Sequence, residues 1–196
     1  MNRIHRWLCA SAAWKKALDQ QFLPWVLDGI DLGGGLLEVG PGPGLTTEFL
    51  RRRVERIAAV EIDARLAESL GRRMANTNVG VVRGDATRLP FRDASFSAAV
   101  ALTMLHHVPS EQMQDRLLGE VCRVLRPNGI FAGMDSTVSL LLRLLHLGDT
   151  MVLADPDSFG ARLQRAGFAG ATVKKAGGRF RLLAVRPSCS TVDACA

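Results

Sequence analysis

The chain has 196 residues, of which 47% are hydrophobic and 22% charged, and it carries a formal net charge of +6 at pH 7. That length suits one domain with a sizeable core, and the composition excludes a disordered chain. The positive charge raises the question of nucleic acid, but the arginines lie in helical stretches without interleaved aromatic residues and tyrosine is absent, so nucleic acid is disfavoured as a partner and a solvated basic surface is favoured.

The cysteines and the apolar runs indicate the cellular compartment in which we expect the protein. The four cysteines, at positions 9, 122, 189 and 195, form no Cys-x-x-Cys pair and no metal-ligand spacing, so no metal site is predicted. The apolar stretch from Trp7 to Trp14 is interrupted by Ser11 and closed by two lysines, which is too short for a signal peptide. No run approaches the roughly 20 apolar residues that span a bilayer. We therefore expect a cytoplasmic protein with no membrane span.

The first 30 residues are predicted to form N-terminal helices packed on the domain that follows. Pro24 divides this segment, and the second helix is expected to end near Gly29. Two tryptophans and His5 here are compatible with capping a ligand pocket, but packing of the helix on the sheet edge is favoured. The helical face is formed by residues at steps of three and four, namely Ile4, Trp7, Leu8, Ser11, Trp14 and Leu18.

A short apolar strand that breaks into alternating glycines comes next. Residues 36–39 form the strand, and Gly40, Gly42 and Gly44 precede a helix that begins near Leu45. Such a loop lets the backbone approach a ligand closely, and the N–H groups at the helix start favour a carboxylate or a phosphate. The pattern is typical of a site for a nucleotide-like cofactor, although a tight turn without a ligand has the same pattern. The dinucleotide fingerprint fits less well, because its third glycine would fall at Leu45.

Strands and helices alternate along the rest of the chain. This alternation predicts an α/β fold: a Rossmann-like, doubly wound, mostly parallel seven-stranded sheet with a C-terminal antiparallel hairpin. Residues 31–186 are expected to form the cofactor-binding domain and residues 187–196 a flexible tail. Asp63 and Ser110 are expected to cap helices. The further strands are expected at residues 57–60, 79–83, 96–102, 130–134, 173–175 and 179–185, and residues 126–129 are expected to form a turn before the strand at 130–134.

Carboxylates follow two of these strands. Glu61 ends the second strand, about 20 residues past the glycine loop, where it can accept both hydrogen bonds of a ribose diol. Asp85 stands just past the third strand. Because the carboxyl ends of parallel strands meet at one crevice, both side chains are expected at the same site as the glycine loop. An acid at the position of Glu61 also serves nicotinamide enzymes, so it does not decide the cofactor by itself.

Three motifs of this region resemble those of the class I S-adenosylmethionine-dependent methyltransferases. Glu38-x-Gly40-x-Gly42-x-Gly44 resembles motif I of that family, and residues 60–63, Val-Glu-Ile-Asp, resemble its second, acidic motif. Gly84-Asp85-Ala86 resembles the motif by which the family reads adenine, where the aspartate accepts from the exocyclic amine and the backbone of the next residue meets a ring nitrogen.

Other stretches resemble one branch of that family, the small-molecule methyltransferases that include ubiquinone and menaquinone biosynthesis enzymes. These stretches are residues 89–96, 105–108 and 125–129, so the resemblance covers approximately residues 36–135. Ser97 departs from the pattern, because that position usually holds aspartate, and a local turn contact is expected to be lost there.

The resemblance implies S-adenosylmethionine as the cofactor and S-adenosylhomocysteine as the product. Residues 31–186 would then be a methyltransferase domain that moves a methyl group to a small-molecule acceptor. Leu102 and Thr103 are expected to offer backbone contacts to the methionine part of the cofactor. The full set of expected cofactor-binding residues is Glu38, Gly40, Pro41, Gly42, Gly44, Glu61, Ile62, Asp85, Ala86, Leu102 and Thr103.

Three residues are candidates for catalysis. His106 and His107 follow the fourth strand, and an imidazole titrates near neutral pH, so either is a candidate general base for a phenol or an alcohol. Asp135, just past the fifth strand, is a candidate by position. The competing interpretation is that one histidine packs against the cofactor and the other caps the following turn.

The acceptor is less well indicated. The leucine-rich stretch 137–153, with residues 140–147 as its most apolar part, is compatible with an apolar, quinol- or lipid-like acceptor pocket, with core packing or with a homodimer face, and core packing is favoured. A non-catalytic S-adenosylmethionine-binding protein stays open as an alternative. An RNA adenine methyltransferase is a weaker rival, because residues 103–106 read Thr-Met-Leu-His where such enzymes have an Asn/Asp-Pro-Pro-Tyr or Asn-Leu-Pro-Tyr motif. An NAD-type oxidoreductase is disfavoured by the glycine spacing and by Asp85.

Overall fold

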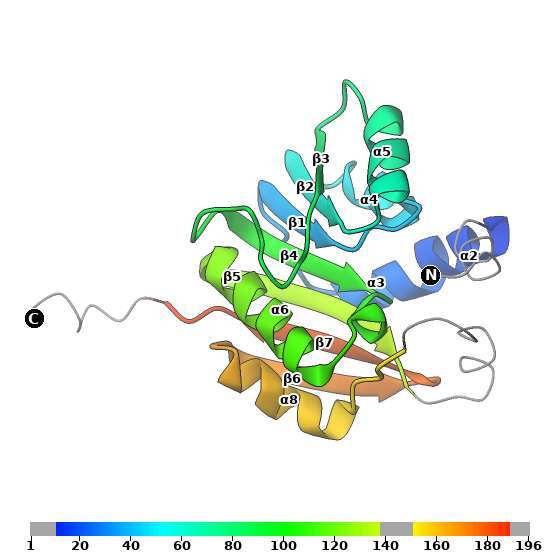
Figure 1. Cartoon of the computed structure of the whole chain (residues 1–196). Coiled ribbons are helices and arrows are strands. Elements are labelled where there is room, and N and C mark those ends of the chain that lie inside the picture. The colour runs from blue at the N-terminus through cyan, green and yellow to red at the C-terminus, as the bar shows by residue number, and fades with distance from the viewer. Residues whose placement is uncertain (1–10, 138–150, 189–196) are drawn as a thin grey trace, which may run out of the picture.

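The computed structural model describes residues 11–137 and 151–188, which form a seven-stranded sheet in the order β3-β2-β1-β4-β5-β7-β6 (Figure 1). The first five strands in this order run parallel, while β7 runs antiparallel to both β5 and β6. The predicted α/β fold with a C-terminal antiparallel hairpin is therefore confirmed. The strands are β1 (Gly35–Val39), β2 (Arg56–Glu61), β3 (Val79–Arg83), β4 (Phe96–Leu102), β5 (Leu125–Ser136), β6 (Ala169–Ala176) and β7 (Arg179–Val185).

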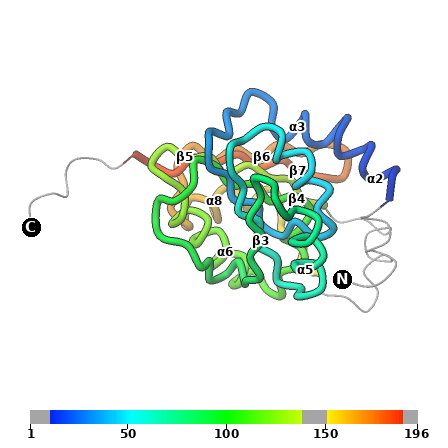
Figure 2. The backbone as a smooth tube through the Cα atoms, turned by 90° about the horizontal axis from the view of Figure 1, so that it is seen from above, coloured from blue at the N-terminus to red at the C-terminus, as the bar shows by residue number. Residues whose placement is uncertain are grey.

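Helices cover both faces of the sheet, because its central strands are apolar on both sides. In β1, Leu36 belongs to one buried cluster and Leu37 to the other. The cluster with Leu37 is completed by α6 (Glu111–Val124) and α8 (Pro156–Arg165), while the cluster with Leu36 is completed by the N-terminal helices, α4 (Leu45–Leu50) and α5 (Ala64–Arg73). Figure 2 shows α3 and α6 on opposite sides of the sheet.

The N-terminal segment is one continuous run of helix in three parts. The α2 helix (Ala12–Ala17) passes into a π-helical turn, η1 (Leu18–Phe22), and then into α3 (Leu23–Leu27). Pro24 is the second residue of α3, directly after the π-helical turn. The leucine-rich residues 140–147, His5 and residues 189–196 of the expected tail lie outside the described residues.

Two helix starts are capped as expected. The Asp63 carboxylate accepts hydrogen bonds from the N–H groups of Arg65 and Leu66 at 2.8 and 3.1 Å. The Ser110 hydroxyl accepts from the Met113 N–H at 3.2 Å. Each cap satisfies N–H groups that a helix leaves without an internal partner, which is why Asp and Ser mark these positions in the sequence.

The fifth strand begins earlier than the sequence indicates. Residues 126–129 were expected to form a turn before a strand at 130–134, but β5 begins at Leu125, which pairs with Phe96, and the register then shifts to pair Ile130 with Ala98. The turn residues are thus an irregularity inside the strand, and Asn128 has a φ of +62° there. Ser97 accepts a hydrogen bond from the Gly35 N–H at 3.1 Å, so this serine makes a contact of its own between β4 and β1.

Among the described residues, no helix is long and apolar enough to cross a membrane.

Candidate cofactor and acceptor site

A cavity of about 260 Å³ lies at the carboxyl ends of β1, β2 and β4. Of the residues expected to bind a cofactor, all line this cavity except Gly44. Of the three candidates for catalysis, His107 lines it, whereas His106 and Asp135 lie outside its lining. The expected residues that line it are Glu38, Gly40, Pro41, Gly42, Glu61, Ile62, Asp85, Ala86, Leu102, Thr103 and His107.

The glycine loop leaves space that a side chain would fill. Gly40 has a φ of +65°, and a Cβ there would lie 2.9 Å from the Cβ of Met104, so the loop packs directly on the chain that follows β4. Gly42 has a φ of +54°, and a Cβ there would meet nothing within 4 Å. The first glycine is therefore needed for packing, and the second lies against open space beside the cavity.

Glu61 joins this loop to the end of β2. One carboxylate oxygen, Oε2, accepts from the Gly42 N–H, and the other, Oε1, accepts from the Asp63 N–H, each at 2.9 Å. The side chain is buried. Each carboxylate oxygen keeps a second lone pair, so Glu61 can hold the loop and still accept hydrogen bonds from a diol.

Glu38 is a buried acid on the cavity wall. The residue is 2% exposed, and Oε2 has no hydrogen-bond partner within the described part of the chain. Burial raises the pKa of Glu38 to about 7, the neighbouring Thr47 hydroxyl opposes that rise, and the charge of Glu61 adds to it. A carboxyl group without a partner is costly to bury, so Glu38 is suited to a cationic or N–H-donating group of a ligand.

Asp85 and Ala86 lie where β3 ends, on a tight turn. The Asp85 Oδ1 accepts from the Thr87 N–H at 2.8 Å, and the Asp85 carbonyl accepts from the Arg88 N–H at 3.0 Å. The Gly84 N–H donates to the Glu61 carbonyl at 3.0 Å, which ties the start of the turn to β2. The turn therefore holds a carboxylate and the next residue's backbone on the same wall of the cavity.

The two histidines belong to a 3₁₀ turn, η2 (Leu105–His107), and they have different surroundings. His106 is 2% exposed, with Nδ1 2.5 Å from Oδ1 of Asp135, which is itself 1% exposed. The His106 N–H donates to Asp135 Oδ2 at 3.1 Å. His107 is partly buried, and its ring lies 4.3 Å from the His106 ring, centroid to centroid. Asp135 thus orients His106 in the interior, and His106 supports the histidine that reaches the cavity.

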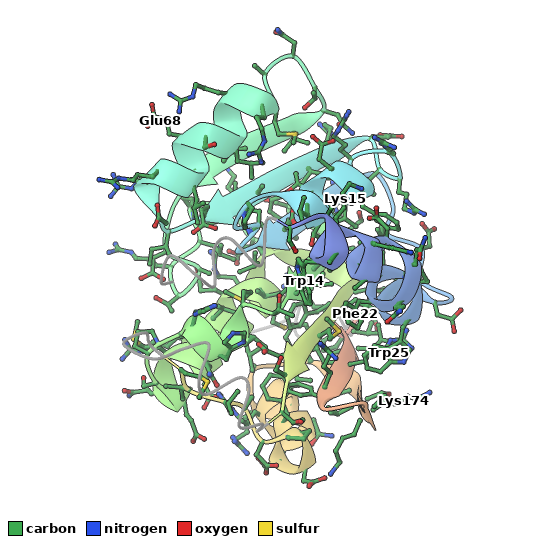
Figure 3. All side chains as sticks on the ribbon, turned by 90° about the vertical axis from the view of Figure 1, so that its right-hand side faces the viewer. Trp14, Lys15, Phe22, Trp25, Glu68 and Lys174 are labelled. Atoms are coloured by element: carbon green, nitrogen blue, oxygen red, sulfur yellow. The ribbon has the colours of Figure 1, made fainter. Side chains whose placement is uncertain are left out.

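Apolar side chains from the N-terminal helix and from the chain after β4 complete the wall. Trp14 and Leu18 line the cavity, as do Met104 and Met113. Trp14 also packs on Phe22, with ring centroids 5.5 Å apart, on the helix seen in Figure 3. The sequence interpretation favoured plain packing for this helix, because helical spacing is the same for packing and for lining a site.

Within the part of the chain that the structure describes, no group of three or more His, Cys, Asp or Glu is arranged to hold a metal ion.

Residues 37–133 match a family model described as a methyltransferase domain. This match, the Rossmann-like fold and the cavity at the strand ends support a class I S-adenosylmethionine-dependent methyltransferase domain over these residues, with S-adenosylmethionine as the implied cofactor. A solved S-adenosylmethionine-dependent methyltransferase from Aquifex aeolicus has the same fold, with a TM-score of 0.66, 17% identity, and coverage of 89% of this chain and 98% of that one.

Two curated relatives are similar over shorter stretches. The phthiotriol/phenolphthiotriol dimycocerosates methyltransferase of Mycobacterium tuberculosis is 36% identical over 109 residues, which are 54% of this chain and 39% of that protein. The probable ribosomal RNA small subunit methyltransferase A of Methanospirillum hungatei is 36% identical over 77 residues, which are 37% of this chain and 30% of that protein. The chain therefore spans well under half the length of the relatives it matches.

Proposed function

We propose that the chain transfers a methyl group from S-adenosylmethionine to a small, apolar acceptor with a phenol- or alcohol-type hydroxyl. The observation that carries this proposal is the composition of the cavity. The lining combines the glycine loop and the carboxylates of Glu38, Glu61 and Asp85 with the apolar side chains of Trp14 and Leu18. A site of this kind can hold a polar cofactor next to an apolar acceptor.

The residues present fit the cofactor. When bound, S-adenosylmethionine supplies a methyl group on a sulfonium, which is already a good leaving group. Glu61 accepts from the ribose hydroxyls while it keeps Gly42 in place, and Asp85 accepts from the exocyclic amine of adenine. Glu38 pairs with the ammonium group of the methionine part, because a buried carboxylate with an open oxygen favours a cation. The protein's contribution is mainly positioning and exclusion of water.

His107 is proposed as the general base. It is the histidine that lines the cavity, and an imidazole can take a proton from a hydroxyl near neutral pH. His106 and Asp135 then act behind it: the buried pair fixes the 3₁₀ turn on which His107 stands. A base is needed only if the acceptor must lose its proton early, so this role applies to phenols and alcohols rather than to amines.

The likeness to a phthiotriol/phenolphthiotriol dimycocerosates methyltransferase supports an apolar acceptor. The match with the mycobacterial phthiotriol/phenolphthiotriol dimycocerosates methyltransferase covers 54% of this chain. We also propose that the chain belongs to the small-molecule branch that includes ubiquinone and menaquinone biosynthesis methyltransferases, because residues 89–96, 105–108 and 125–129 resemble that branch.

Ribosomal RNA is the second candidate acceptor, because the archaeal relative acts on ribosomal RNA by name and the net charge here is +6. Two features of the sequence disfavour this acceptor. Residues 103–106 read Thr-Met-Leu-His and the chain has no tyrosine, so the Asn/Asp-Pro-Pro-Tyr or Asn-Leu-Pro-Tyr motif that holds an adenine amine is missing.

The proposal is tested by methyl transfer. The protein is incubated with S-adenosylmethionine labelled in the methyl group and with a panel of phenols, quinols, fatty acids, amines and ribosomal RNA. We expect label in apolar hydroxyl compounds, with turnover that falls when His107 is replaced by Gln. Label in RNA alone would replace the acceptor proposal, and tight cofactor binding without transfer to any acceptor would favour a non-catalytic binding protein.

A further inference from the structure

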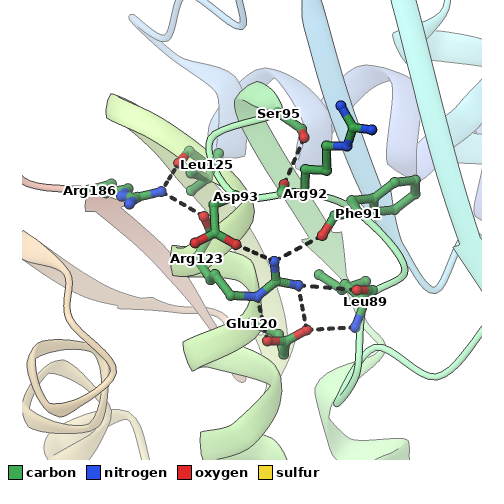
Figure 4. A network of polar contacts seen from close by, with 9 residues as sticks. All are labelled: Leu89, Phe91, Arg92, Asp93, Ser95, Glu120, Arg123, Leu125 and Arg186. Atoms are coloured by element: carbon green, nitrogen blue, oxygen red, sulfur yellow. Dashed lines mark hydrogen bonds and ion pairs between the residues drawn. The ribbon is translucent and has the colours of Figure 1, made fainter.

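An arginine near the end of α6 holds the loop that joins β3 to β4 (Figure 4). Arg123 uses all five N–H groups of its guanidinium. Nε donates to Glu120 Oε1 at 2.7 Å, and Nη2 donates to Glu120 Oε2 at 2.8 Å and to the Leu89 carbonyl at 3.1 Å. Nη1 donates to the Phe91 carbonyl at 2.9 Å and to Asp93 Oδ1 at 2.6 Å. One side chain thus binds three residues of a single loop.

Glu120 also binds the loop directly. Its Oε2 also accepts from the Leu89 N–H at 2.7 Å, so both polar groups of the Leu89 backbone are held by the Glu120–Arg123 pair. The hydrogen bond from Arg123 lowers the pKa of Glu120, and the bonds to Glu120 and Asp93 raise the pKa of Arg123. The side chains of Arg123 and Glu120 are 32% and 22% exposed, against 69% for Asp93, so the Glu120 contact is the less screened of the two.

The loop that Arg123 holds begins with Asp85 and Ala86, the residues proposed to bind adenine. Leu89 follows the Asp85 turn directly, in which the N–H groups of Thr87 and Arg88 donate to Asp85 itself. At the other end of the turn, the Gly84 N–H donates to the end of β2. The span from Asp85 to Leu89 is therefore compact and fixed at both ends: by the sheet at Gly84 and by Arg123 at Leu89.

We propose that Arg123 is a positioning residue for adenine recognition. Through Leu89 its guanidinium aims the Asp85 carboxylate and the Ala86 backbone at the adenine edge, without touching the cofactor. This inference rests on the proposed function of the cavity. It also gives a physical role to Arg123 and to the stretch 89–96, which was linked above only to a branch of the family. Lysine cannot replace this arginine, because an ammonium has three donors and no planar fork.

The test compares Arg123→Lys with Arg126→Lys. Arg126 lies on the surface three residues further on, so Arg126→Lys is a matched control for the same chemical change. Two ligands are titrated by calorimetry: S-adenosylhomocysteine, and S-inosylhomocysteine, in which a carbonyl replaces the exocyclic amine. Amide hydrogen exchange of residues 85–89 is measured on the ligand-free proteins. All measurements are made well below each variant's melting temperature.

We expect Arg123→Lys to weaken S-adenosylhomocysteine binding about tenfold, to lower the preference for the adenine ligand over the inosine ligand at least threefold or so, and to speed exchange at residues 85–89. Arg126→Lys should leave all three readouts within about twofold of the parent. Should Arg123→Lys fail to fold, Asp93→Ala removes one acceptor of the same guanidinium at an exposed position and should move the readouts in the same direction by a smaller factor.

A loss of affinity with unchanged adenine preference would overturn the inference, since general loosening of the protein does not discriminate between the two bases. Unchanged affinity would overturn it as well, even if exchange became faster. If the parent protein bound neither ligand, the proposed function itself would fall and the inference with it. That result is distinct, because it appears in the parent and not only in the variant.

Discussion

Replacement of Glu38 by glutamine is expected to make the free protein more stable and the cofactor complex weaker. Burial raises the pKa of Glu38 from 4.5 to about 7, so the folded protein holds a proton that the unfolded chain releases. Because the pKa is higher in the folded protein, protonated Glu38 contributes to the free energy of unfolding. This contribution is fully present below about pH 4.5 and is lost as the pH rises through about 7. Between about pH 5 and pH 8 the parent should lose on the order of 2.5 kcal/mol of unfolding free energy at this one residue.

The Glu38→Gln variant should not show this loss, so urea denaturation at about pH 5 and pH 8 separates the two proteins. In the parent, affinity for S-adenosylhomocysteine should rise roughly eightfold from about pH 6 to pH 7.5, as the ionised fraction of a group with a pKa near 7 rises. In Glu38→Gln the rise should vanish and the affinity at about pH 7.5 should fall about tenfold or more, since a charge-assisted hydrogen bond is lost. Parallel stability profiles for parent and variant would refute the reasoning.

Three further substitutions test the walls of the cavity. Glu61→Gln should lower affinity for S-adenosylhomocysteine about tenfold in calorimetry, and the loss should be smaller for a 2′-deoxy analogue that cannot use the full diol. His107→Gln should reduce turnover of phenol acceptors by about 100-fold with cofactor affinity nearly unchanged, and an equal loss with amine acceptors would argue against a base. Trp14→Ala should raise the acceptor KM several-fold, which corresponds to about 1 kcal/mol of lost contact, and an acceptor KM equal to that of the parent would remove Trp14 from the acceptor site.

The alternation of strands and helices and the glycine loop could be predicted because each depends on local pattern. The apolar runs, the glycine spacing and the caps at Asp63 and Ser110 all act over a few neighbouring residues. The start of β5 could not be predicted in this way. It depends on a partner far along the chain, since Leu125 pairs with Phe96 across a shift in register.

In the candidate site, the strand-end acids and the glycine loop could be predicted from the sequence, whereas the contribution of the N-terminal helix could not. A strand-end acid or a glycine loop has few other uses, whereas the spacing of Trp14 and Leu18 is that of any packed helix. The adjacent histidines pose the same difficulty. In a tight 3₁₀ turn one ring faces Asp135 in the interior and the next faces the cavity, and which is which follows from the position of β5 and not from the sequence Leu-His-His. Glu120 and Arg123 likewise have the spacing of an ordinary surface pair.

The two buried glutamates of the cavity show why residue type alone does not determine role. Glu61 accepts two backbone N–H groups, so its carboxylate is satisfied before any ligand arrives and can serve as a fixed part of the loop. Glu38 has an oxygen without a partner in the described chain, and its burial disfavours charge. A cationic ligand group therefore gains most at Glu38, where it relieves a cost that the fold carries alone, and a diol gains most at Glu61, where the acceptors are already oriented. In the proposed complex the two acids would therefore contact different parts of the cofactor because their hydrogen bonds differ, although both are glutamates.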